Sequence, residues 1–427
     1  MGPCLSGVPN PVKNRKAAVA FILITVVIDM LAFGMIIPVL PLLVESFIKG
    51  DPVKGAEMYG LFGTAWAIMQ FLFSPMQGVL SDRFGRRTII LISCTGLGLD
   101  FLLMAVAPTL SWLFVGRVIS GICAASISTA GAYIADVTPK EKRAAAFGLI
   151  GAAFGIGFVL GPAFGGLLGH INARLPFWAA AVLALANATY GFFVLPESLP
   201  PEKRSKSFSW KKANPVGALV LLRAHPILSG LAISQFLMNL AHSVLPSTAV
   251  IYMAYRYHWD SDKVGYLLAG VGACAVVVQG FLVKPIVARI GERKALALGL
   301  MFGAAGFAIY GVAPNGFWYC LGVPIMSLWG IANPSAQGIM THLVEPTEQG
   351  QLQGALSSLM GIASCIGPGL FTQSFAIAIG VYAAWGIPGA PFLLAALFLV
   401  CASFIAWRTT RPAHIGVVAG EPAKVNG

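Results

Sequence analysis

Long hydrophobic runs dominate this chain, and polar residues gather in the short segments between them. A helix needs about 20 apolar residues to cross the hydrocarbon core of a bilayer, and twelve runs reach that length. We therefore predict an all-α membrane protein with twelve transmembrane helices. The runs cover residues 17–44, 58–80, 88–107, 110–137, 144–169, 175–195, 226–254, 264–283, 294–313, 316–344, 351–380 and 388–407.

The longest polar break, residues 197–225, separates the first six runs from the last six. Several features recur between the two parts at a constant offset of 206 residues: Gly85 matches Gly291, and Gly161-Pro162 matches Gly367-Pro368. Parallel structural repeats of this kind are one plan of secondary transporters, with the substrate site between the halves. We expect two pseudo-symmetric six-helix bundles at 1–196 and 226–410, joined by a linker at 197–225 and followed by a tail at 411–427.

Composition supports a membrane protein and excludes a water-soluble globule. The chain is 57% hydrophobic, 10% charged and has a mean hydropathy of +0.80. The net charge of +12 does not indicate nucleic acid, because 22 of the 28 Lys and Arg residues fall at the termini, in the linker and in alternate loops, against 5 in the other loops. The positive-inside rule then places both termini and the linker in the cytoplasm, as in a multi-pass protein of a bacterial inner membrane. The seven cysteines lack metal-type spacing, and we expect no metal site.

A charged segment between the second and third runs is the most specific motif in the chain. It reads Gly-Val-Leu-Ser-Asp-Arg-Phe-Gly-Arg-Arg from Gly78 to Arg87. A short, glycine-hinged loop of this kind can form and break ion pairs between helices that rock against each other. The residues that could make and break such ion pairs, or hinge the loop, are Gly78, Asp82, Arg83, Gly85, Arg86 and Arg87, with Asp136 at the end of the fourth run. The counterpart in the second half has Ala288 where Asp82 stands.

The fifth run carries small residues four positions apart, with a proline among them. Such a face lets another backbone approach closely, and the proline bends the helix. The residues are Gly157, Gly161, Pro162, Gly165 and Gly166.

Four ionisable residues stand out at membrane depth within the apolar runs: Asp29, Asp100, Arg117 and His242. A charge in hydrocarbon is costly, so each is a functional candidate. A carboxylate in a low-dielectric cavity, such as Asp29, can take up and release a proton as the cavity opens to either side. Asp29 could instead be a static hydrogen-bonded carboxylate, Asp100 could be a structural ion-pair partner of Arg117, and His242 is more often a hydrogen-bonded polar residue than a proton carrier.

Amide and aromatic side chains within the runs are candidates to line a substrate cavity. Phe33, Trp66, Phe236 and Trp329 could complete an amphiphilic pocket. The polar candidates are Gln70, Gln235, Asn239, His242, Gln279, Asn333 and Gln337.

These motifs resemble those of the major facilitator superfamily. The loop from Gly78 to Arg87 is similar to its signature loop, which implies that Asp82 and the other residues named above, with Asp136, form a cytoplasmic gate. The fifth run resembles the motif of its antiporters, and the segment around Arg117 resembles a motif whose arginine couples to protonation. With Gln70, Leu99-Asp100, Gln279 and the segment Glu348 to Gly354, the chain resembles the tetracycline/proton antiporters from about residue 20 to 375. This chain differs from that family at two polar positions: it has Ala275 where the family has a histidine and Gly303 where the family has an aspartate.

The resemblance implies a proton-coupled exporter of a drug-like or amphiphilic molecule that works by alternating access. Because no Asp or Glu occurs inside the second-half runs, we assign proton coupling to Asp29, Asp100 and Arg117. We expect a monomer driven by the proton gradient, without cofactor or nucleic-acid partner and without enzymatic chemistry, since no metal cluster, nucleophile or phosphate loop is evident. The alternative is a proton symporter or an exporter of a sugar or other metabolite.

Overall fold

The structure is a computed structural model that describes residues 11–124, 126–139, 143–205, 214, 217–219, 221–222, 226–345 and 348–411. The predicted tail at 411–427 lies outside the described residues except for Arg411, and so does most of the linker after Ser205. In the first half the helices are α1 (Pro11–Ile36), α2 (Leu40–Phe47), α3 (Pro52–Phe84), α4 (Arg86–Val106), α5 (Leu110–Cys123), α6 (Ser126–Val137), α7 (Arg143–Ile171) and α8 (Leu175–Val194).

Short helical turns, η2 (Pro201–Lys203) and η3 (Gly217–Leu219), lie in the linker. The second half contains α10 (Pro226–His242), α11 (Val244–Tyr257), α12 (Ser261–Val277), η4 (Val278–Leu282), α13 (Val283–Ile290), α14 (Glu292–Val312), α15 (Gly316–Ser327), η5 (Leu328–Ile331), α16 (Ala332–His342), α17 (Gln349–Ile379), η6 (Ala383–Trp385) and α18 (Ala390–Thr409).

Prolines account for several breaks within the predicted runs. Pro38 and Pro41 lie where the first run divides into α1 and α2, and Pro246 follows the break between α10 and α11. Pro334 follows η5, a short 3-10 segment between α15 and α16. A proline has no N–H to donate to the carbonyl four residues earlier, so the α-helical ladder is interrupted there.

The helix of the second run, α3, extends beyond the predicted limits of 58–80, because it begins at an N-cap residue, Asp51, and ends at a glycine, Gly85. The Asp51 side chain accepts hydrogen bonds from the backbone N–H groups of Val53, at 3.0 Å, and Lys54, at 3.1 Å. At the other end Gly85 has φ of +100°, a conformation that a side chain would strain. The helix therefore spans 33 residues, Pro52–Phe84.

Within the described residues, nine helical segments are long and apolar enough to cross a membrane, and Leu110–Cys123 is a shorter apolar helix. The predicted all-α membrane class is confirmed. The remaining predicted runs coincide with α3, with α5 and α6, and with α15, η5 and α16. The helices are thus consistent with twelve spans, a number that stays a prediction.

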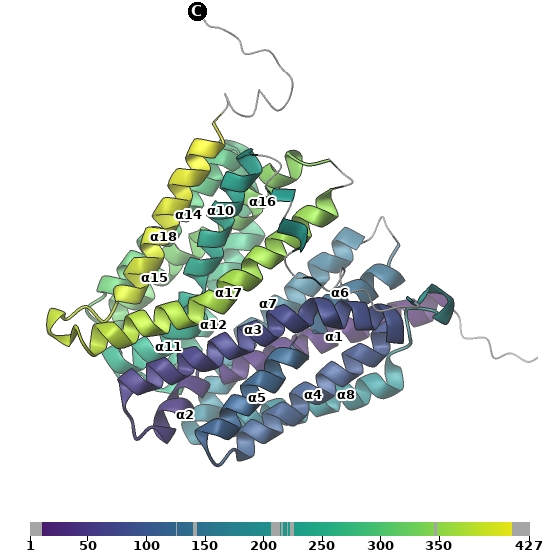
Figure 1. Cartoon of the computed structure of the whole chain (residues 1–427), viewed down its shortest axis with the longest axis horizontal. Helices are drawn as coiled ribbons and strands as arrows, with labels where there is room; N and C mark the ends of the chain where they lie inside the picture. Colours follow the sequence, from purple (N-terminus) through teal and green to yellow (C-terminus); the bar gives the residue numbers. More distant parts are fainter. Residues whose placement is uncertain are drawn as a thin grey trace, which may run out of the picture.

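The two halves lie against each other along two pairs of helices, α3 with α17 and α7 with α12 (Figure 1). In the first pair Gly63 packs against Pro368 and Gly361 faces Phe71. Beyond these contacts the helices diverge toward the end that carries the α3–α4 turn, α6 and α16 (Figure 1). We call this the gate end and the other the opposite end.

Candidate functional site

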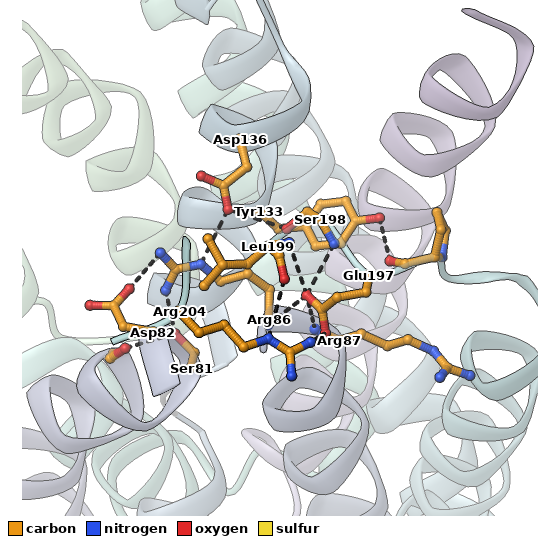
Figure 2. A network of polar contacts seen from close by, with 12 residues as sticks. Ser81, Asp82, Arg86, Arg87, Tyr133, Asp136, Glu197, Ser198, Leu199 and Arg204 are labelled. Atoms are coloured by element: carbon orange, nitrogen blue, oxygen red, sulfur yellow. Dashed lines mark hydrogen bonds and ion pairs between the residues drawn. The ribbon is translucent and has the colours of Figure 1, made fainter. Parts of the chain in front are cut away.

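Arg86 is the centre of an ion-pair network at the gate end (Figure 2). Its Nη2 lies 2.6 Å from Oδ1 of Asp82, and its Nε lies 3.3 Å from Oδ2 of Asp136. Nη1 donates to the Ser81 hydroxyl, and the Ser198 hydroxyl donates to Asp136 at 3.2 Å. The structure therefore brings together three of the predicted gate residues, and these contacts involve only the first half and Ser198 at the start of the linker.

Glu197, which was not predicted as a site residue, joins the end of the sixth run to this network. Its Oε2 lies 3.6 Å from Nη2 of Arg204. A carboxylate is favoured at a helix N-terminus, where the first backbone N–H groups lack helical partners. Its Oε1 accepts hydrogen bonds from the backbone N–H groups of Arg86, Arg87, Ser198 and Leu199, at 2.9, 3.5, 3.0 and 3.1 Å. The available signal was an acid directly after an apolar run, on the same predicted side of the membrane as the start of α4.

Two other predicted gate arginines point elsewhere. Arg87 donates from Nη2 to the carbonyl oxygen of Phe192 at 2.6 Å and lies over the ring of that residue, 5.5 Å from its centroid. Arg83 lies over the ring of its neighbour Phe84, at 5.3 Å. Arg87 therefore connects α4 to α8 and takes no part in the described ion pairs.

The small-residue face of α7 packs directly on α1. A side chain at Gly161 would place its Cβ 2.8 Å from both Cα of Gly34 and the carbonyl oxygen of Leu31, closer than ordinary contact. At Gly157 the corresponding Cβ would lie 2.6 Å from Cβ of Met30. The backbones of α1 and α7 thus approach each other as the spacing of small residues predicted.

Gly166, about one helical turn further along α7, faces the second half. Its carbonyl oxygen accepts a hydrogen bond from the Ser261 hydroxyl at 3.2 Å, and a Cβ on it would lie 3.0 Å from Cα of Gly265. His170 Nδ1 and Asp262 Oδ1 lie 3.9 Å apart nearby. One helix, α7, therefore carries a face toward its own half and a second face toward the other half.

The three predicted coupling residues are buried in the first half. The exposed fractions are 9% for Asp29, 1% for Asp100 and 7% for Arg117. Asp100 and Arg117 lie within electrostatic range of each other, yet they do not form one of the ion pairs seen among the described residues. The Asp29 carboxylate lies close enough to Cys94 on α4 for the two side chains to interact electrostatically.

Two polar candidates of the second half, Gln235 and Asn333, are in direct contact, and a third, His242, lies beside an aromatic candidate. Gln235 donates from Nε2 to the side-chain oxygen of Asn333 at 3.2 Å, and the His242 ring lies 5.6 Å from the Trp329 ring. Gln279 is exposed and lies on the π-helical segment η4, a geometry often found at functional sites. The remaining candidates, Gln70, Asn239 and Gln337, are half-buried.

A pocket of about 120 Å³ lies between the halves, and none of the amide candidates lines it. Phe33, Trp66 and Arg117 from the first half do, as the sequence suggested for the aromatic pair. Hydroxyl groups that the sequence analysis passed over also contribute, because Ser and Tyr in apolar runs usually serve packing. These lining residues are Tyr59, Ser243, Ser247 and Ser364.

Gly303, where the resembled family has an aspartate, lies against an indole ring. A Cβ at this position would lie 2.8 Å from Cγ of Trp329 and 2.7 Å from Cδ1 of Leu399. Trp329 in turn packs edge-on against Phe307, at 5.6 Å. The space for an acidic side chain at this position is therefore filled by Trp329. Within the described residues, no group of three His, Cys, Asp or Glu residues could hold a metal ion.

Comparison with known proteins gives consistent matches over most of the chain. The family model described as Major Facilitator Superfamily matches residues 22–368 and 231–425. The class C tetracycline resistance protein of Escherichia coli is 38% identical over 394 residues, which are 91% of this chain and 96% of that protein. The class G protein of Vibrio anguillarum is 35% identical over 392 residues, again 91% and 96%.

Two solved structures share the arrangement of helices. A bacterial homologue of the human lysosomal transporter Spinster, in an inward-facing and occupied conformation, has a TM-score of 0.75 at 14% identity and covers 95% of this chain and 98% of its own. The human organic anion transporter TETRAN has a TM-score of 0.68 at 24% identity, with 92% and 99% covered.

Proposed function

The chain belongs to the major facilitator superfamily, and we propose from this premise that it exports an amphiphilic, drug-like molecule in exchange for protons, as in tetracycline-type efflux. The observation that carries the proposal is the likeness to tetracycline resistance proteins over nearly the full length of both chains. The close packing of α7 on α1, at the motif that resembles the antiporter signature, supports export over uptake.

The proposed topology puts the gate end in the cytoplasm of a bacterial cell, with the chain in the inner membrane and both termini cytoplasmic. The bias of Lys and Arg toward that side supports this orientation. We propose that the chain acts as a monomer, without a cofactor, and draws its energy from the proton gradient.

In the proposed cycle, substrate enters from the gate end, toward which the helices of the two halves diverge (Figure 1). The halves are in contact through α3 with α17 and α7 with α12, and both ion pairs of Arg86 lie within one half. Rocking of the halves would then bring Asp82 toward the second half and close the gate end.

Proton coupling is assigned to Asp29, with Asp100 and Arg117 as its modulators. Burial supports this, because a group that alternates between charged and neutral forms must be shielded from one side of the membrane while it faces the other. His242 is the rival carrier in the second half, and its exposed side chain beside Trp329 makes it accessible to substrate as well.

Inverted membrane vesicles test the proposal. With an imposed proton gradient, the wild-type protein should accumulate tetracycline, while Asp29→Asn should lose uphill accumulation and keep downhill exchange of substrate. If Asp29→Asn still pumped uphill and His242→Ala did not, the carrier would be the histidine. Outward movement of substrate together with protons would instead favour the symporter alternative.

A further inference from the structure

A cluster of basic side chains lies at the gate end of α14 and α18, two helices that pack side by side (Figure 1). Lys294 near the start of α14 is exposed, and so are Arg408 and Arg411 at the end of α18. Arg293 joins the two helices, because its Nε donates to the Thr410 hydroxyl at 3.2 Å. The four basic residues therefore lie along one edge of the second half.

No acid of the described chain forms an ion pair with this cluster. The ion pairs among the described residues include none of its four members. Glu292, the acid next to Arg293 in the sequence, has its carboxylate against Gly338 on α16 instead. The cluster thus presents several positive charges at the surface, which an anion from outside the chain can approach.

The exposed faces of the two helices beside the cluster are apolar. On α14, Leu298 and Met301 follow Lys294 at helical spacing and are 40% and 49% exposed. On α18, Phe404 is 61% exposed and Trp407 is 40% exposed. Residues three or four positions apart lie on one face of a helix, so these apolar side chains continue the faces that carry the cations. In a membrane such faces contact acyl chains, and the cations then stand at the level of the headgroups.

Aromatic rings support the cations at this level. The Arg408 guanidinium lies 5.5 Å from the centroid of the Phe404 ring, and that of Arg293 lies over the Trp407 ring. The corresponding place in the first half is different, because residues 190–196 at the end of α8 include no Lys or Arg. A bias of positive charge toward the cytoplasm would not by itself confine the cluster to the lipid-facing edge of one half.

We propose that this edge of α14 and α18 binds the headgroup of an anionic phospholipid. The phosphate accepts hydrogen bonds from Lys294 and Arg408, and the acyl chains lie along the apolar faces at Leu298, Met301 and Phe404. Basic sites between transmembrane helices on the cytoplasmic side recognise such headgroups. A free phosphate would use the cations and leave the apolar faces without a partner. The site lies on the outer edge of one half, so its existence does not depend on the proposed transport function.

Native mass spectrometry of the delipidated full-length protein tests the proposal with two lipids of identical acyl chains, phosphatidylglycerol and phosphatidylcholine. Anionic phosphatidylglycerol should bind at least about tenfold more tightly, since each nearby Lys or Arg strengthens the binding of an anionic headgroup roughly fivefold. The double variant Lys294→Gln/Arg408→Gln should lower the affinity for phosphatidylglycerol by at least about tenfold and leave that for phosphatidylcholine unchanged. The charge-conserving variant Lys294→Arg/Arg408→Lys should keep most of the preference.

The matched control is Lys263→Gln/Lys284→Gln, which removes two charges from exposed side chains of the same half, on α12 and α13. It should change both affinities by less than about twofold, because the effect of a charge falls off within a Debye length. The proposal would be overturned by equal binding of the two lipids to the wild type or by an equal loss in the control. Displacement of bound phosphatidylglycerol by an equal concentration of inorganic phosphate would also overturn it.

A second measurement leaves the cluster intact. In nanodiscs, phosphatidylglycerol brominated in its acyl chains should quench the fluorescence of Trp407 more strongly than brominated phosphatidylcholine. The Trp407 signal is the difference between the wild type and Trp407→Phe, a variant that keeps a ring beneath Arg293. Equal quenching by the two lipids would overturn the proposal even if the double variant failed to fold.

Discussion

The contact between α1 and α7 can be tested with one methyl group. Replacing Gly161 by alanine places a Cβ 2.8 Å from Cα of Gly34 and from the Leu31 carbonyl oxygen, whereas ordinary contact begins at 3.4 Å. The two backbones must therefore separate by about 0.6 Å or strain locally. Overpacking of this kind costs about 1–3 kcal/mol, against which the lower chain entropy of alanine returns about 0.5–1 kcal/mol.

The same helix offers a matched control. Gly155 has nothing within 4 Å of the place where a Cβ would stand, so Gly155→Ala should be neutral or stabilising by about 0.5–1 kcal/mol. Thermal denaturation of the two purified variants at one scan rate should give a lower apparent Tm for Gly161→Ala than for Gly155→Ala. Efflux in inverted vesicles should fall in the first variant and persist in the second. Equal stability and equal efflux in the two would refute the idea that α1 and α7 depend on direct backbone contact.

Three further predictions concern the gate end and the topology. Asp82→Asn should abolish or greatly reduce efflux while the protein remains folded in the membrane, because Arg86 loses the carboxylate 2.6 Å away and keeps Asp136; unimpaired efflux would remove the gate role. Glu197→Gln retains one acceptor at the start of α4 but loses the charge, so the free energy of unfolding should fall by about 0.5–1 kcal/mol. Glu197→Ala should lose more, and equal stability of the wild type and both variants in calorimetry would contradict this role of Glu197. A reporter fused after Gly427 should read cytoplasmic, and a periplasmic signal would reverse the assigned orientation.

The fold class and the family could be predicted because their signals are local in the sequence. Apolar runs long enough to cross a bilayer do not depend on what packs beside them, and a spacing of four between Gly157, Gly161 and Gly165 places all three on one helix face. The breaks after α1 and α10 follow from prolines in the same way, although their effect on helix limits was not anticipated.

Other features depend on which helix packs against which, and the sequence carries no such information by itself. Glu197 caps α4 only because the chain after α8 returns to the start of α4, and Tyr59 faces the pocket only because α3 packs on the second half. The filling of the Gly303 position by Trp329 requires the register between α14 and the η5 segment. Helix register of this kind is a tertiary property, so it became visible only in the structure.

Arg87 and Arg293 occupy equivalent places in the two halves, and each binds the last helix of its own half. Arg293 donates from Nη2 to the Trp407 carbonyl oxygen at 2.9 Å and lies 4.0 Å from the centroid of that ring, as Arg87 does with Phe192. Each arginine thus links the helices of the third and sixth predicted runs of its half, α4 with α8 and α14 with α18. Each of these helix pairs should therefore move as a rigid unit. Two spin labels within one pair should keep a fixed separation, while the distance between labels on α8 and α18 should change by the full amplitude of the rocking motion.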